Sequence, residues 1–151
     1  MGYYMRVLLE DWEERPLSEL LAHSRAYGHE LRTDAPQDDA DWRDAELYGP
    51  EAVVPIEVDV NVGDDMVREE LDELREELED CDADTKAVAK VHAHLDRTRA
   101  IVAVRPLASE GERGLKSAWA VLDYYAQRDG VLFHADAEGF YDGPDLIVAT
   151  G

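Results

Sequence analysis

Apolar and polar residues alternate strictly from Val54 to Val62, which is the period-two pattern of a strand with one buried and one wet face. Pro55 cannot donate a hydrogen bond to a neighbouring strand, so it indicates a strand start or an edge strand. Shorter runs of aliphatic, aromatic and β-branched residues predict five more strands. They cover residues 3–9, 29–33, 100–107, 131–134 and 146–150.

Helical spacing of apolar residues predicts four helices between these strands. The first begins at Pro16, which suits a first helical turn, and ends at Gly28. The second buries an apolar stripe over residues 67–78, and the third follows a break at residues 82–84. The fourth, from about residue 112 to residue 129, is the longest. Its expected inward side chains are Leu115, Trp119, Leu122 and Ala126.

The predicted order of elements is β-α-β-β-α-α-β-α-β-β, in a single α+β domain over residues 1–151. Because helices return between strands, we expect a mixed or antiparallel sheet with the helices packed on one face, ferredoxin-like in plan. Residues 34–50 carry many acids and a single arginine, which predicts an acidic loop. Trp42, Leu47 and Tyr48 are expected to pin this loop to the body of the domain.

Acidic residues dominate the composition, with 36 Asp and Glu against 15 Lys and Arg and a net charge of −21. Such a surface repels phosphate backbones, which argues against direct nucleic-acid binding through a basic patch. Two explanations of the acidity stay open. One is adaptation to a salty cytoplasm, where counterions screen the carboxylates, and the other is a basic protein partner.

No apolar run approaches the roughly 20 residues that span a bilayer, and the first residues lack the features of a signal peptide. We therefore expect no membrane contact and a cytoplasmic location. The single cysteine, Cys81, cannot form an internal disulfide, and it lies in register with the apolar stripe of the second helix.

No arrangement of residues identifies a cofactor or metal, and none is predicted. The segment from Asp59 to Glu70 has the acids of a calcium loop, but Asp64 stands where that loop needs glycine. His92 and His94, two residues apart on a helix, point roughly 200° from each other and cannot share a metal. A lone cysteine excludes a thiolate zinc cluster, and the sequence has neither a phosphate-binding glycine loop nor a serine elbow.

The stretch from Glu57 to Asp84 holds 14 acidic residues against two arginines. Several like-charge pairs lie four residues apart on its helix, and each such pair costs about 0.2–0.5 kcal/mol at low salt. They include Glu69 with Glu73, Glu73 with Glu77, Asp72 with Glu76, and Glu76 with Asp80. This helix therefore needs screening ions, a bound cation or a basic partner.

The segment from Gly130 to Asp142 places carboxylates and aromatic side chains together on a tight connection. Its sequence, GVLFHADAEGFYD, resembles the ending of small uncharacterised prokaryotic proteins that carry a similar strand followed by A-D-G-E-G-F-Y-D. Ala137 departs from that pattern, which has glycine at this position. The resemblance implies no activity.

A patterned, charged surface without assembled chemistry favours a non-catalytic interaction or regulatory module. The alternative is an enzyme or small-ligand-binding protein with a site built from scattered carboxylates and histidines. The first hypothesis predicts a flat or acidic patch, and the second predicts a concave pocket that encloses His134 or His92 with acids. Mimicry of nucleic acid by the acidic helix is a third hypothesis.

The last helix and the connection after it form the candidate interaction surface. If Leu115 and Trp119 point inward, Val121 and Tyr124 lie on the far side of the same helix, where apolar groups need a cover. A second copy of the chain or a basic protein is the expected cover, with another element of the same chain as the alternative. The residues of this surface are Val121, Tyr124, Asp136, Glu138, Phe140, Tyr141 and Asp142.

Overall fold

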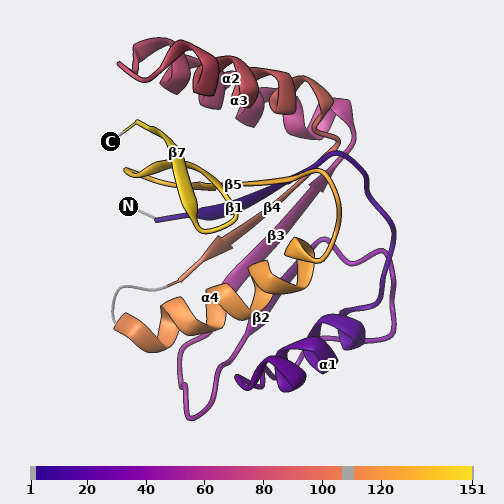
Figure 1. Ribbon diagram of the computed structural model, residues 1–151. Coiled ribbons are helices and arrows are strands. Elements are labelled where there is room, and N and C mark those ends of the chain that lie inside the picture. The colour runs from indigo at the N-terminus through magenta and orange to yellow at the C-terminus, as the bar shows by residue number, and fades with distance from the viewer. Residues whose placement is uncertain (1–2, 107–110, 151) are drawn as a thin grey trace.

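One antiparallel sheet of seven strands organises the protein, in a computed structural model that describes residues 3–106 and 111–150 (Figure 1). The strands are β1 (Met5–Leu9), β2 (Asp44–Leu47), β3 (Ile56–Val62), β4 (Ala100–Arg105), β5 (Val131–Ala135), β6 (Gly139–Asp142) and β7 (Asp145–Ala149). Their spatial order is β2-β3-β4-β1-β5-β6-β7, so the first strand lies at the centre. Every neighbouring pair is antiparallel.

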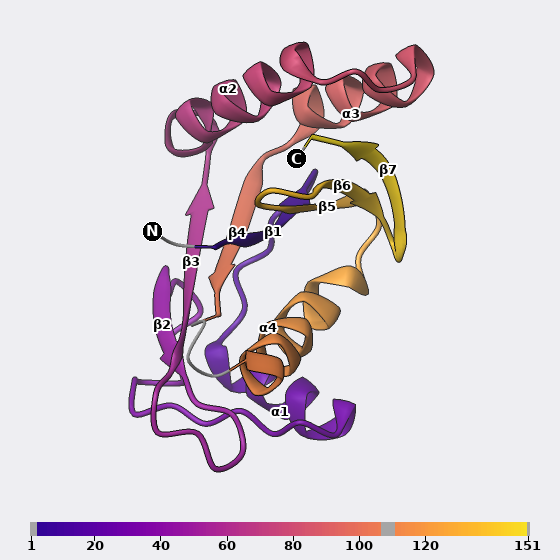
Figure 2. The same cartoon turned by 90° about the vertical axis from the view of Figure 1, so that its left-hand side faces the viewer.

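Four helices cover both faces of this sheet, so the described chain forms three layers (Figures 1 and 2). They are α1 (Leu17–Tyr27), α2 (Asp64–Asp80), α3 (Thr85–Arg97) and α4 (Gly111–Ala126). α1 and α4 pack on one face, and α2 and α3 pack on the other. The expectation that all helices share one face is therefore wrong, and the ferredoxin-like plan is not confirmed. Within the described ranges, no helix has the length and apolar character needed to cross a membrane.

The central strands explain the two helical layers, because both of their faces are apolar. Met5, Val7 and Leu9 of β1 face α1 and α4, whereas Leu8 faces α2 and α3. The first five residues of β4, AIVAV, are all buried. Continuous apolar runs of this kind are typical of strands that are covered on both sides. The alternation that predicts one wet face belongs to β3, which lies nearer the sheet edge.

The structure has two strands that were not predicted and lacks one strand that was predicted. Residues 29–33 contribute an isolated bridge, between Arg32 and Tyr48, instead of a strand. Inside the predicted loop at residues 34–50, β2 pairs with β3, and Ala45 and Leu47 are its buried residues. β6 occupies part of the predicted connection, so three strands follow α4 instead of two. Both added strands have only four residues, too few for a clear alternation.

α2 is the most acidic element, and its predicted apolar stripe is confirmed. Val67, Leu71, Leu74 and Leu78 are buried against the sheet. Its two arginines form ion pairs with neighbouring aspartates. Because the aspartates of these pairs are well exposed, the pairs contribute little to stability and leave most of the like-charge repulsion in place.

We expect the thermal stability to rise with monovalent salt, because screening relieves the like-charge pairs of α2. Their repulsion totals roughly 1–2 kcal/mol at low ionic strength. For a chain of this size, the melting temperature measured by circular dichroism should rise by about 5 °C between low and molar potassium chloride. Glu73→Gln removes two of these pairs, with Glu69 and with Glu77, so the melting temperature of this variant should respond less to salt. An unchanged melting temperature would show that ion pairs already neutralise α2.

Candidate functional site

α4 is rotated about its axis relative to the sequence-based prediction. Val121 and Tyr125 are buried in the core, whereas Leu115 and Trp119 are each 42% exposed. α4 packs against both the sheet and α1, so its buried face is wide and uses small residues for close approach. Those small buried residues are Gly114, Ser117, Ala118 and Ala120. Leu115 and Trp119 therefore lie at the border of the buried face, whereas Leu122 is buried as expected.

The predicted interaction surface is divided by the structure. Val121 and Phe140 are fully buried, one in each of the two cores, so their assignment to the surface is wrong. Tyr124 is half-buried between α1 and α4, where its hydroxyl donates to Glu19, so another element of the same chain covers it. The remaining members lie at or near the surface beyond β5: Asp136, Glu138, Tyr141 and Asp142.

A cleft of about 560 Å³ opens between α4 and the strands β1, β5 and β6. Trp119 and Phe133 form part of its wall, with ring centroids 6.3 Å apart in an edge-to-face contact. Leu115 adds to this wall from the same helix. The other apolar lining residues are Met5, Leu122, Ala126, Ala135 and Pro144. Leu115 and Trp119 were expected in the core, so the apolar wall of this cleft was not predicted. The alternative hypothesis expected a concave pocket with His134 and acids, and His134, Asp123 and Glu138 are among the lining residues.

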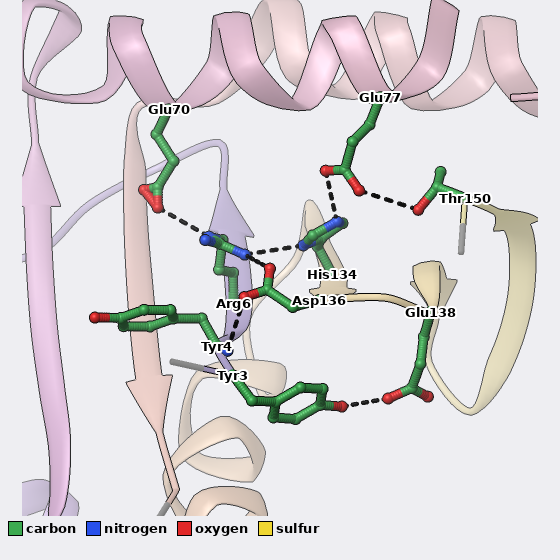
Figure 3. Close-up of polar contacts among 9 residues, drawn as sticks. All are labelled: Tyr3, Tyr4, Arg6, Glu70, Glu77, His134, Asp136, Glu138 and Thr150. Atoms are coloured by element: carbon green, nitrogen blue, oxygen red, sulfur yellow. Dashed lines mark hydrogen bonds and ion pairs between the residues drawn. The ribbon is translucent and has the colours of Figure 1, made fainter. Parts of the chain in front are cut away.

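A carboxylate held by two tyrosines lies among the polar residues of the cleft. The hydroxyl of Tyr3 donates to Oε2 of Glu138 (Figure 3), and the hydroxyl of Tyr141 donates to Oε1 at 2.7 Å. These two hydrogen bonds lower the pKa of Glu138 below its ordinary value, so the carboxylate is ionised at neutral pH. Glu138 was among the predicted surface residues, whereas Tyr3 was not.

The turn between β5 and β6 fixes the backbone around Glu138. Ala137 has a φ of 64°, a left-handed conformation that costs alanine more than glycine. This is the one position where the segment departs from the A-D-G-E-G-F-Y-D pattern. Gly139 has a φ of 138°, and a Cβ there would lie 2.0 Å from the carbonyl oxygen of Val148. Any side chain at residue 139 would therefore displace β7.

On the opposite face of the sheet, Arg6 is the centre of a polar network beneath α2 (Figure 3). Its Nε donates to Oε1 of Glu70 at 2.9 Å, and its Nη1 donates to Oδ1 of Asp136 at 2.7 Å. Asp136 also accepts from the backbone N–H of Tyr4 at 2.9 Å. The Arg6 side chain is only 14% exposed, so this network holds a cation largely away from water.

His134 joins this network as a neutral imidazole. Nη1 of Arg6 lies 3.1 Å from Nδ1 of His134, and because a guanidinium only donates, Nδ1 accepts and the ring proton is on Nε2. Burial lowers the pKa of His134, and the charge of Arg6 acts in the same direction, whereas Glu77 opposes them. Oε2 of Glu77 lies 3.1 Å from Nε2, without the alignment of a hydrogen bond.

His92 and His94, which the sequence analysis excluded as a metal pair, have different surroundings in the structure. His94 is buried and donates from Nε2 to the carbonyl oxygen of Leu8 at 2.9 Å, while His92 is half-buried. Across residues 3–106 and 111–150, no group of three or more His, Cys, Asp or Glu side chains is placed to hold a metal ion. The cleft and the Arg6 network each bring together polar residues from distant parts of the chain.

Comparison with known proteins assigns this chain to no family. No family model matches it, and no curated protein or solved structure matches it either. The resemblance of residues 130–142 to the endings of small prokaryotic proteins stays a prediction. Function is consequently inferred from the geometry of the chain itself.

Proposed function

We propose that this protein is a non-catalytic binding protein that takes a small organic molecule into the cleft beside α4. The cleft volume of about 560 Å³ lies in the range typical of small-molecule sites. Leu115 and Trp119, two large apolar side chains in its wall, remain partly exposed on a very acidic protein. Covering them with an apolar ligand removes this surface from water, which favours binding.

The polar side chains that line the cleft support binding over catalysis, because none of them has the properties of a general base or an activated nucleophile. Glu138 accepts from two tyrosine hydroxyls, which lower its pKa and make its carboxylate a weak base at neutral pH. Arg6 pairs with Glu70 and with Nδ1 of His134 beneath α2, and Nε2 of His134 is buried. The described lining residues include no Ser, Thr, Cys or Lys that could act as a nucleophile.

The predictions about cellular context are retained as proposals beside this function. A cytoplasmic location, the salty-cytoplasm explanation of the acidity and a basic partner rest on composition. Association with a second copy was expected from Val121 and Tyr124 of α4, which other elements of the same chain cover. The cleft does not depend on them, because one chain supplies all of its lining residues.

A neutral aromatic molecule of matching size is expected to bind beside Trp119. In ¹H–¹⁵N NMR spectra, 2-phenylethanol should shift the indole N–H of Trp119 together with the backbone signals of Phe133 and Tyr141. Trp119→Ala removes part of the wall and should weaken this binding about tenfold, which corresponds to roughly 1.4 kcal/mol of lost apolar contact.

The control for this prediction is Tyr27→Ala, which truncates an aromatic side chain of similar exposure that does not line the cleft. Its affinity for 2-phenylethanol should equal that of the unmodified chain. Shifts that spread over other surfaces, or an undiminished affinity in Trp119→Ala, would contradict the proposed function.

A further inference from the structure

We infer that the ligand of the cleft is an organic cation, with an amine or quaternary ammonium group on an apolar body. This inference rests on the proposed function and adds the chemical class of the ligand to it. The ammonium group pairs with the carboxylate of Glu138, and the apolar body lies against Trp119 and Leu115. The assignment of an organic cation rests on the arrangement of charge around the cleft.

Glu138 has the properties of a partner for an ammonium group. Tyr3 and Tyr141 donate to different oxygens of this carboxylate, which leaves each oxygen a second lone pair. The side chain is exposed and lines the cleft, so a ligand can reach those lone pairs. The two tyrosine hydroxyls also fix its orientation and keep it ionised, as the lowered pKa of Glu138 indicates. Hydrogen bonds between an ammonium group and a fixed carboxylate are among the stronger polar contacts.

Positive charge is scarce around the cleft. Arg6 is the one Lys or Arg among the described lining residues, and its guanidinium is engaged by Glu70 and Asp136 beneath α2. An anionic ligand would therefore meet no free cation there, on a chain whose net charge is −21. The same field attracts cations and raises their concentration at the surface.

The aromatic lining separates an organic cation from an inorganic one. Tyr3, Trp119, Phe133 and Tyr141 all contribute to the cleft, and the faces of such rings attract ammonium groups. A metal ion would leave this aromatic wall unused. It would also lack ligands, because the described residues contain no group of three or more His, Cys, Asp or Glu placed to bind a metal.

Three probes with the same phenylethyl body test the inference: 2-phenylethylamine, 2-phenylethanol and 3-phenylpropanoate. Each is titrated at neutral pH into the full chain, in potassium chloride at about 0.5 M, which screens non-specific attraction to the acidic surface. The dissociation constants are taken from the shift of the Trp119 indole N–H. We expect the amine to bind about tenfold more tightly than the alcohol, and the propanoate to bind more weakly than the alcohol.

Two variants with the same change of net charge assign the selectivity to one residue. Glu138→Gln keeps the shape of the side chain and removes its charge, so the amine and the alcohol should bind with nearly equal affinity. Glu69→Gln makes the matched change on an exposed part of α2, away from the cleft. This control should keep the preference for the amine.

The outcomes separate the inference from the proposed function. Equal affinities for the amine and the alcohol in the unmodified chain would overturn the cationic ligand and leave the cleft as a site for neutral molecules. A preference for the amine that persists in Glu138→Gln would overturn the role of this carboxylate. Failure of all three probes to bind at Trp119 would overturn the proposed function itself. If Glu138→Gln does not fold, the affinities of the three probes for the unmodified chain still decide whether the ligand is a cation.

Discussion

Replacing Arg6 by methionine is expected to lower the free energy of unfolding by about 3 kcal/mol, because it leaves two carboxylates without their cation. Glu70 and Asp136 both pair with this guanidinium, and their side chains are only 19% and 31% exposed. Methionine retains most of the apolar stem, so the loss reports on charge more than on packing. For a chain of this size the melting temperature should fall by about 10 °C, as measured by circular dichroism.

Arg105→Met is the matched control for this prediction. Arg105 lies on the neighbouring strand β4 and, among the described residues, pairs with Glu57 at 3.3 Å, with the two side chains 32% and 44% exposed. A pair this open to water contributes about 1 kcal/mol or less. If the Arg6 and Arg105 variants melt at the same temperature, the network beneath α2 has no special role in stability.

The elements with strong local patterns were predicted accurately from the sequence. β3 follows its alternation, α2 buries the predicted stripe, and α1 ends at Gly28 with a φ of 92°. Each of these features depends on residues within a few positions of one another. Local spacing therefore contains the information needed to predict them.

The faces of the elements were harder to predict than the elements themselves. Of the side chains of α4 expected to point inward, Leu122 is buried, whereas Leu115 and Trp119 are partly exposed because packing against two neighbours also turned small residues inward. Helix spacing alone does not reveal how many neighbours a helix has. The same lack of tertiary information led to the expectation of helices on one face of the sheet. The continuous apolar runs of β1 and β4 nevertheless indicated that helices cover both faces.

The candidate site combines a predicted segment with residues that no local pattern brings together. Glu138 and Tyr141 were predicted as part of a functional surface. Tyr3, which donates to Glu138, and Trp119, which lines the same cleft, come from distant parts of the chain. The contacts of Arg6 with Glu70 and Asp136 span 64 and 130 positions in the sequence. One signal for the network was available, since Arg6 is the only charged residue of an otherwise apolar strand.

Val121→Asp is expected to abolish the native fold, because it places a carboxylate in a core without a partner. Val121 is 0% exposed and belongs to the core cluster that also contains residues of α1, β1 and β4. Burial of an unpaired charge belongs to the few mechanisms that cost more than about 4 kcal/mol, a large part of the stability of an ordinary domain. Circular dichroism should show loss of helical signal at 25 °C, or a urea midpoint far below that of the unmodified chain.

Leu115→Asp makes a comparable change six residues earlier on the same helix and distinguishes the two orientations of α4. Leu115 is 42% exposed, so its replacement should cost at most about 1 kcal/mol and leave the spectrum native. The rotated helix of the sequence-based prediction requires the reverse result, with Leu115→Asp unfolded and Val121→Asp folded. The Leu115 variant should also bind 2-phenylethanol more weakly, since Leu115 forms part of the cleft wall. A folded Val121→Asp protein would restore this residue to a surface, and with it the interface originally predicted there.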